Sequence, residues 1–236
     1  MKTYKRLFTL VTVILVTVIL ASCSKTAENE HLPEYCRTYS GFMAFASSDL
    51  YNEVGGINRD NYLSVISRNE LTLEAYDEFD EFDLNGIQCF QNLTSLSMEG
   101  KGFKDISPIS ALKNIQRISL TSTNVVNISS FRNLSKVNYL TISDTKTLQS
   151  VDGVEEMTKL TYLDLSDNGI VNIDGLNNLL NLNTLNLSNN EITYFPSINN
   201  LELLETLDVS YNNIIQLGDD LSGLRNFKNF IANDNQ

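Results

Sequence analysis

The stretch that decides the fold is residues 160–181, which read LTYLDLSDNGIVNIDGLNNLLN, followed by the equivalent residues 182–203, LNTLNLSNNEITYFPSINNLEL. Leucines recur at the first, fourth and sixth positions, an asparagine at the ninth and an isoleucine at the eleventh. The pattern restarts every 22 or 23 residues, at Leu93, Ile115, Val137, Leu160, Leu182, Leu204 and Phe227. Such a period is typical of a repeat protein, in which each unit packs only on its neighbours.

Each unit has a simple structural interpretation. The Leu-x-Leu alternation predicts one short strand per repeat, and stacked strands form a parallel sheet. Return segments such as residues 170–179 lack the length of an α-helix, so we expect turns or short 3₁₀ pieces there. An amide both donates and accepts, which predicts a structural ladder where the chain leaves the strands, made of Asn168, Asn190, Asn212 and Asn235. In the earlier repeats this position holds Lys101, Thr123 and Thr145.

These motifs resemble the leucine-rich repeat family, and the 22-residue period resembles its bacterial internalin type. The resemblance covers residues 84–236. It implies an α/β repeat solenoid with one short parallel strand per 22–23-residue repeat, a convex side of turns and 3₁₀ pieces, and a concave strand face. Residues 31–83 do not repeat and are expected to form a partly helical N-terminal cap, in which the apolar spacing predicts a helix over residues 61–76.

The N-terminus has the pattern of a bacterial export signal. Three basic residues precede an apolar run of 14 residues at 7–20, which is shorter than the roughly 20 residues needed to span a bilayer. The tetrapeptide LASC at residues 20–23 resembles the bacterial lipobox. That resemblance implies a signal peptide at residues 1–22, lipid such as palmitate on Cys23 as the membrane anchor, and a polar tether at residues 23–30. We therefore expect a lipoprotein of the cell envelope, in the outer membrane and exposed at the surface.

Composition excludes several classes of function. The chain carries 17 Lys and Arg against 29 Asp and Glu, a net charge of −12, which disfavours binding to nucleic acid. Its one histidine, His31, leaves neither a His-based zinc site nor a His-centred acid–base mechanism. We found no nucleophile–base pair, phosphate loop or metal-ligand cluster, so we expect neither an enzyme nor a cofactor or metal protein.

Two cysteines remain beyond the lipidation site, Cys36 and Cys89. The envelope outside the cytoplasmic membrane permits disulfides, so one interpretation is a bridge that joins the cap to the repeats. The other is a pair of free buried thiols, because spacing along the sequence does not establish that the two Cα atoms lie close enough.

Outward strand positions predict the binding surface. Tyr139 and Tyr162 occupy the same column in consecutive repeats, and tyrosine is a frequent anchor of protein interfaces. The predicted partner-binding residues are Arg117, Tyr139, Tyr162, Asp164, Asp208 and Tyr211. The favoured function is binding of a protein partner, from the host or from bacteria, through the concave face. The alternative is a carbohydrate-binding or nutrient-capture lipoprotein, in which the tyrosines contact a glycan.

Overall fold

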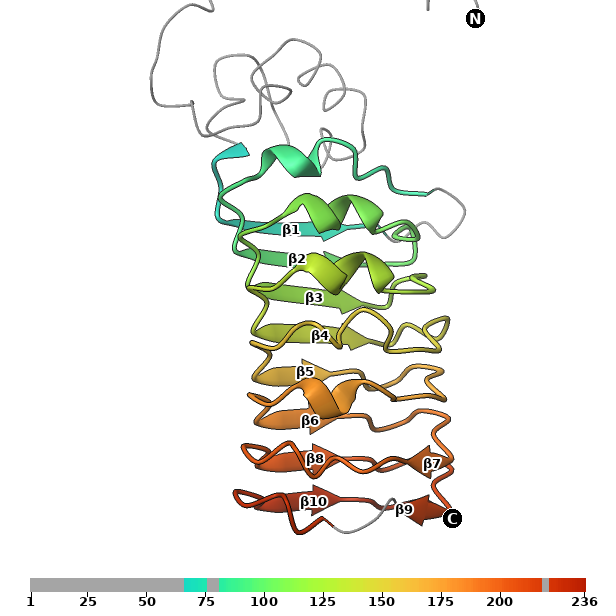
Figure 1. Cartoon of the computed structure of the whole chain (residues 1–236). Coiled ribbons are helices and arrows are strands. Elements are labelled where there is room, and N and C mark those ends of the chain that lie inside the picture. The colour runs from blue at the N-terminus through green and yellow to red at the C-terminus, as the bar shows by residue number, and fades with distance from the viewer. Residues whose placement is uncertain (1–65, 76–80, 218–220) are drawn as a thin grey trace, which may run out of the picture.

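The computed structural model describes residues 66–75, 81–217 and 221–236. Each turn of the chain adds one strand to a parallel sheet of eight, in the order β1-β2-β3-β4-β5-β6-β8-β10 (Figure 1). The strands of this sheet are β1 Glu70–Glu74, β2 Ser95–Glu99, β3 Arg117–Thr121, β4 Tyr139–Ser143, β5 Tyr162–Asp164, β6 Thr184–Asn186, β8 Thr206–Asp208 and β10 Asn229–Ile231. This stack of parallel strands confirms the predicted repeat solenoid.

The return segments contain little regular structure, as predicted. In the described residues they form short 3₁₀ helices: η3 Ile87–Cys89, η4 Ser107–Ala111, η5 Ser129–Asn133 and η6 Leu176–Asn178. Two later return segments are extended instead, and β7 (Tyr194–Phe195) pairs in parallel with β9 (Gln216–Leu217).

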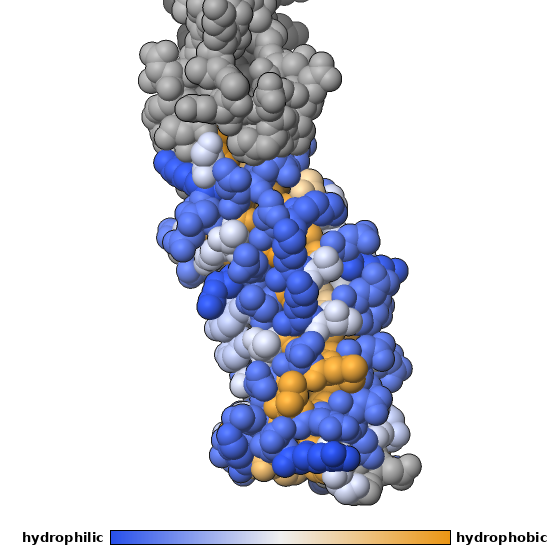
Figure 2. Space-filling view, turned by 60° about the vertical axis from the view of Figure 1, so that its left-hand side comes forward, coloured by the Kyte–Doolittle hydropathy of each residue, from blue (hydrophilic) through white to orange (hydrophobic). Residues whose placement is uncertain are grey.

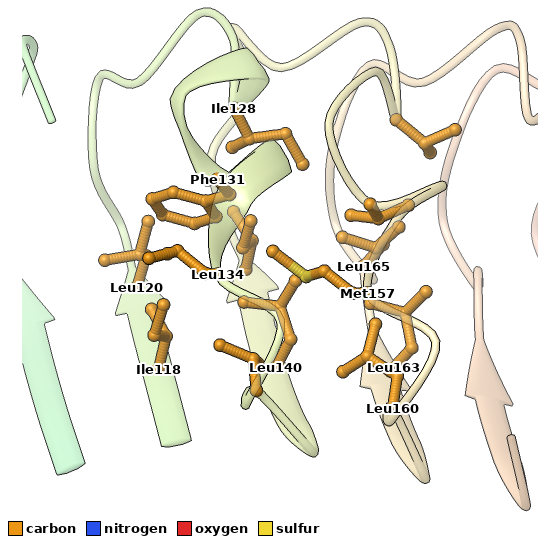
Figure 3. Packing of buried hydrophobic residues seen from close by; sticks show 14 of the residues in the cluster. Ile118, Leu120, Ile128, Phe131, Leu134, Leu140, Met157, Leu160, Leu163 and Leu165 are labelled. Atoms are coloured by element: carbon orange, nitrogen blue, oxygen red, sulfur yellow. The ribbon is translucent and has the colours of Figure 1, made fainter. Parts of the chain in front are cut away.

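The core lies between the sheet and the return segments. Strands pair in register, so Ile118 lies beside Leu140 and Leu140 lies beside Leu163, and all three side chains are fully buried. In Figure 3, Phe131 on η5 points toward Leu120 of β3, and both are buried. Each repeat thus buries its apolar side chains mainly against its own return segment and the adjacent repeats.

The sheet begins earlier than the sequence pattern predicts. The helix expected over residues 61–76 is wrong at residues 70–74, which form strand β1 and pair with β2. Leu71 and Leu73 are buried while Glu70, Thr72 and Glu74 are exposed. This alternation has the period of two that a strand requires, and it outweighs the helical spacing of the apolar residues before it.

Strand length changes along the array because one side chain competes with the sheet. The third strand position is Ser or Thr in β2, β3 and β4, which have five residues each, but Asp or Asn in β5, β6 and β8, which have three. In β5 the carboxylate Oδ1 of Asp164 accepts a hydrogen bond from the Ser166 backbone N–H at 3.0 Å. Asn186 and Asp208 make the same bond to the residue two positions later. Such local bonds divert a backbone donor that would otherwise extend the strand.

The chain leaves each strand through a left-handed corner. In six consecutive repeats the residue just before the ladder position has a φ of 53–58°, and these residues are Ser122, Asp144, Asp167, Asn189, Tyr211 and Asp234. Asp and Asn tolerate this conformation better than most residues, whereas it is unusual for a bulky side chain. Tyr211 is therefore the outlier of the column, and its side chain is 59% exposed.

The asparagine side chains bind backbone groups across the repeats. Asn190 Oδ1 accepts from the Ile170 N–H at 3.0 Å, and Asn190 Nδ2 donates to the carbonyls of Leu165 and Leu187 at 2.9 and 3.0 Å. Asn168, Asn212 and Asn235 make equivalent sets of bonds. Each asparagine thus satisfies otherwise buried donors and acceptors of its own repeat and the preceding one.

Threonines take over this position in two earlier repeats. Thr123 and Thr145 are buried, and their hydroxyls hydrogen-bond to each other at 2.9 Å. The Thr145 backbone N–H then donates to Asn168 Oδ1 at 2.9 Å. The ladder therefore continues where the asparagine is absent.

Replacement of Asn190 by alanine should leave the buried Ile170 N–H without its acceptor. The carbonyls of Leu165 and Leu187 each lose one of two asparagine donors, because Asn168 and Asn212 also bind them. A buried unpaired group costs roughly 1–3 kcal/mol, so we expect the free energy of unfolding to fall by about that much in urea titration. The control is Ser188→Ala, which removes one hydroxyl bond to Asn186 Oδ1 from a partly exposed residue and should cost less than about 1 kcal/mol. Equal losses in the two variants would contradict the structural role of the ladder.

Candidate partner-binding face

Two tyrosines form a stacked pair on the outward side of the sheet, here called the strand face. Tyr139 of β4 and Tyr162 of β5 are register partners. Their ring centroids lie 4.3 Å apart and the ring planes differ by 3°. Parallel strands hold equivalent residues about 4.8 Å apart, which suits two flat rings lying face to face. The columnar placement predicted from the repeats therefore produces direct ring stacking.

An arginine covers the other face of the first ring. Arg117 of β3 is the register partner of Tyr139, and its Cζ lies 5.1 Å from the centroid of the Tyr139 ring. This is a cation–π arrangement. Tyr139 consequently lies between a guanidinium and a second aromatic ring.

A carboxylate completes the cluster. The Tyr162 hydroxyl donates to Asp164 Oδ2 at 3.4 Å, while Asp164 Oδ1 is held by the Ser166 N–H. Burial, with further contributions from the Asp164 charge and from Tyr139, raises the pKa of Tyr162 to about 12. The phenol of Tyr162 is therefore protonated and uncharged throughout the neutral range. We refer to Arg117, Tyr139, Tyr162 and Asp164 as the tyrosine cluster.

The two remaining predicted residues lie away from this cluster. Asp208 is on β8, separated from Asp164 by Asn186 of β6, so the two carboxylates are two strand spacings or about 10 Å apart. Tyr211 stands at the left-handed corner after β8. The structure thus brings four of the six predicted residues together.

The strand face is acidic. Among the described strands of the main sheet, the outward positions carry the carboxylates Glu70, Glu74, Glu99, Asp164 and Asp208 and the single base Arg117. Asp144 and Asp167 follow at the corner, where Lys146 Nζ lies 3.6 and 3.9 Å from their Oδ1 atoms. Lys146 is thus already engaged at the corner, while the strands themselves keep a net negative charge.

Sequence reasoning missed a second set of asparagine bonds at the opposite side of the repeat. Asn114, Asn181 and Asn226 stand one position before the repeat start and donate to the carbonyls of Gln91, Thr158 and Glu202. The recurrence of Asn at this position was the available signal. In one repeat this position holds Leu203, which is 41% exposed. Leu180, the residue before Asn181, is 54% exposed. Figure 2 shows apolar residues gathered in the lower half of a mostly hydrophilic surface.

One of the three predicted cysteine sites lies within the described residues. Cys23 and Cys36 lie outside the described residues. Cys89 is fully buried and disulfide-bonded. Its pairing with Cys36 stays a prediction.

The described residues contain neither a metal-ligand cluster nor a membrane-spanning helix. Within them, no group of three or more His, Cys, Asp or Glu side chains is placed to hold a metal ion. The described part of the chain also contains no helix with the length and apolar character needed to cross a membrane.

The raised pKa of Tyr162 has a measurable consequence. Between the ordinary tyrosine pKa of about 10 and the value of about 12, the folded protein keeps a proton that the unfolded chain releases. The free energy of unfolding should therefore fall as pH rises through this window. In urea titrations between pH 10 and pH 12, the free energy of unfolding of Tyr162→Phe should fall less than that of the unmodified protein. The difference in free energy of unfolding between the two proteins at pH 8 serves as the reference. Identical pH dependence would contradict the assignment.

Comparison with known proteins gives the fold an independent basis. A family model described as "Leucine Rich repeats (2 copies)" matches residues 158–199. The structure of internalin C2 (inlC2) from Listeria monocytogenes is 20% identical with a TM-score of 0.50, and the match covers 78% of this chain and 90% of that one. An internalin (inlF) from the same organism is 22% identical with a TM-score of 0.48, over 75% of this chain and 58% of that one.

The chain spans 58% of the length of the inlF structure and 90% of the inlC2 structure. No curated protein matches the chain. At 20% identity, the likeness to the internalin C2 structure concerns the fold alone. Together with the repeat match and the stacked parallel strands, it establishes the architecture: this chain folds as a leucine-rich repeat solenoid.

Proposed function

We propose that this chain binds a protein partner on its strand face, with the tyrosine cluster at the centre of the interface. The observation that carries the proposal is the stacked pair of Tyr139 and Tyr162. Tyrosine offers a large contact area, few rotatable bonds and a polar tip, and it is enriched at the centres of interfaces. Leucine-rich repeat folds such as that of the internalin structures suit protein–protein interaction.

The sheet itself does not need tyrosines at this column. Thr184 of β6 and Thr206 of β8 occupy the same column, and these strands pair in the same parallel register. A cross-strand pair contributes at most about 1 kcal/mol to the sheet. Two adjacent, half-buried aromatic rings outside the core therefore favour recognition over a purely structural role.

The ring geometry favours a protein over a glycan. A carbohydrate platform presents exposed aromatic faces to the sugar. Both faces of Tyr139 are covered, one by Arg117 and one by Tyr162. One face of Tyr162 is covered by Tyr139, and the chain contains no tryptophan. We therefore favour a protein partner, and the glycan array in the binding experiment tests the alternative.

We further propose that lipid on Cys23 holds the protein in the envelope, at the outer membrane and displayed at the surface. The support is the LASC junction after a short apolar run, together with the disulfide at Cys89, since disulfides persist in oxidising compartments. A tether of residues 23–30 would then separate the membrane from the folded part of the chain.

The binding proposal is tested with the double variant Tyr139→Ala, Tyr162→Ala. We expect it to stay folded by circular dichroism and to lose partner affinity by more than about 2 kcal/mol, or roughly 30-fold. The partner is first captured from envelope and host extracts and identified, and a glycan array is run in parallel. The matched control is Ser95→Ala, Asn229→Ala, which alters the same column on β2 and β10, outside the tyrosine cluster. A folded double variant with unchanged affinity would move the interface elsewhere.

The anchoring proposal is tested by replacing Cys23 with alanine. We expect the variant to leave the detergent phase, or to accumulate with its signal peptide uncleaved, because it has no thiol to receive lipid. Ser24→Ala is the control, since it keeps the LASC sequence. Recovery of the Cys23→Ala protein as a mature, detergent-soluble lipoprotein would disprove the assignment.

A further inference from the structure

Arg117 covers one end of the stacked tyrosine pair, the end next to β3. On the β3 side, the Arg117 guanidinium covers the outer face of Tyr139. On the β6 side, the register partner of Tyr162 is Thr184, and the next residue in the column is Thr206. Since the two rings are stacked almost parallel, the outer face of Tyr162 is turned toward these short side chains. The side chains of this column therefore shorten from a tyrosine ring to threonine. This change in height forms a step on the strand face beside Tyr162.

Carboxylates border this step. Asp164 follows Tyr162 on the same strand, and Asp208 lies in the same column two strands further on. Each uses Oδ1 to accept a backbone N–H of its own repeat, at 3.0 and 2.9 Å, which fixes the carboxylate in place. Among the described residues, the salt bridges involve neither Asp164 nor Asp208. Within the described part of the chain, these two positioned carboxylates thus form no salt bridge.

We infer that an arginine side chain of the protein partner lies on the outer face of Tyr162 and donates hydrogen bonds to Asp164. The inference rests on the proposed function and specifies the chemistry of the partner. Arg117 on Tyr139 is the internal precedent, because it shows that this stack accepts a guanidinium at the same spacing of one strand. The guanidinium is planar and donates in a fork, so it stacks on a ring and reaches a carboxylate at once, which an ammonium does less well.

The remaining charge distribution extends this match. Asp208 lies about 10 Å beyond Asp164 along the stack of strands, within reach of a second basic residue. The outward strand positions carry five carboxylates against one arginine, and the whole chain has a net charge of −12. A negative surface of this kind attracts a basic partner during diffusional encounter and disfavours an acidic one. The partner surface is therefore basic, with arginine at its centre.

The test uses the full chain and a defined probe, the acetylated and amidated peptide Gly-Arg-Gly-Arg-Gly. Two matched peptides replace arginine with lysine or with citrulline, which has nearly the shape of arginine without its charge. Binding is followed by NMR titration of the Tyr162 ring and the Leu163 amide. We expect the arginine peptide to shift both signals, the lysine peptide to bind several-fold more weakly, and the citrulline peptide to leave them unchanged.

The chain offers well-matched variants. Asp164→Asn should weaken the arginine peptide about tenfold without disturbing the turn, because Asn186 makes the same bond to its own repeat. Asp174→Asn, at an exposed carboxylate on a return segment, removes the same charge and should change little. Thr184→Arg should place a guanidinium of the chain itself on the outer face of Tyr162 and abolish peptide binding.

Each result supports or overturns the inference. Equal weakening by Asp164→Asn and Asp174→Asn would reduce the effect to general attraction and overturn it, as would equal binding of the citrulline peptide or an absence of binding. The same variants are then assayed with the captured protein partner. A partner that depends on Tyr139 and Tyr162 but ignores Asp164→Asn and Thr184→Arg would refute the arginine contact and leave the proposed function standing. If the peptide binds at this site but the double variant Tyr139→Ala, Tyr162→Ala leaves the affinity for the partner unchanged, the proposed function is refuted and the site's preference for arginine stands.

Discussion

The structure depends on hydrogen bonds between equivalent positions of consecutive repeats. Because strands pair in register, each residue type recurs as a column: leucine beside leucine in the core, asparagine beside asparagine at the exit, and tyrosine beside tyrosine on the strand face. The ladder side chains maintain this register, since Asn190 connects backbone groups of two repeats with a single amide. A shift of one residue would turn the leucines outward and separate the rings, so the core and the strand face are fixed by the same alignment.

Asp164 combines a structural bond with a place in the proposed binding surface. Its Oδ1 ends the strand by capturing the Ser166 N–H, and its Oδ2 accepts the Tyr162 hydroxyl. The neighbouring strand uses Asn186 for the first task and therefore lacks the charge. The choice between Asp and Asn at this column leaves the turn intact but changes the electrostatics of the strand face, which allows ligand preference to vary without loss of fold.

The period of the sequence predicted most of this architecture because repetition makes the same local signal appear seven times. The prediction fails where the sequence does not repeat. Residues 70–74 lie 25 residues before their partners on β2, outside the 22–23-residue spacing. Their apolar spacing predicts a helix, but they form a strand. Ser166 and Ser210 continue the alternation of outward positions in the sequence but are buried, because each strand has already ended. The columns placed Arg117, Tyr139 and Tyr162 on adjacent strands, but the 3° ring stacking depends on rotamers that no sequence pattern specifies.

The position of the tyrosine cluster along the stack has a consequence for dynamics. Arg117, Tyr139 and Tyr162 lie on the third, fourth and fifth of the eight strands. In a linear repeat protein the free energy of local opening is lowest at the outer units and highest in the interior, because an inner unit must break two interfaces to open. The rings therefore belong to the part of the sheet whose amide protons exchange most slowly. Outer repeats can fray and re-form while the strand face around the rings keeps its geometry, so transient opening at the ends of the array would leave the proposed binding surface intact.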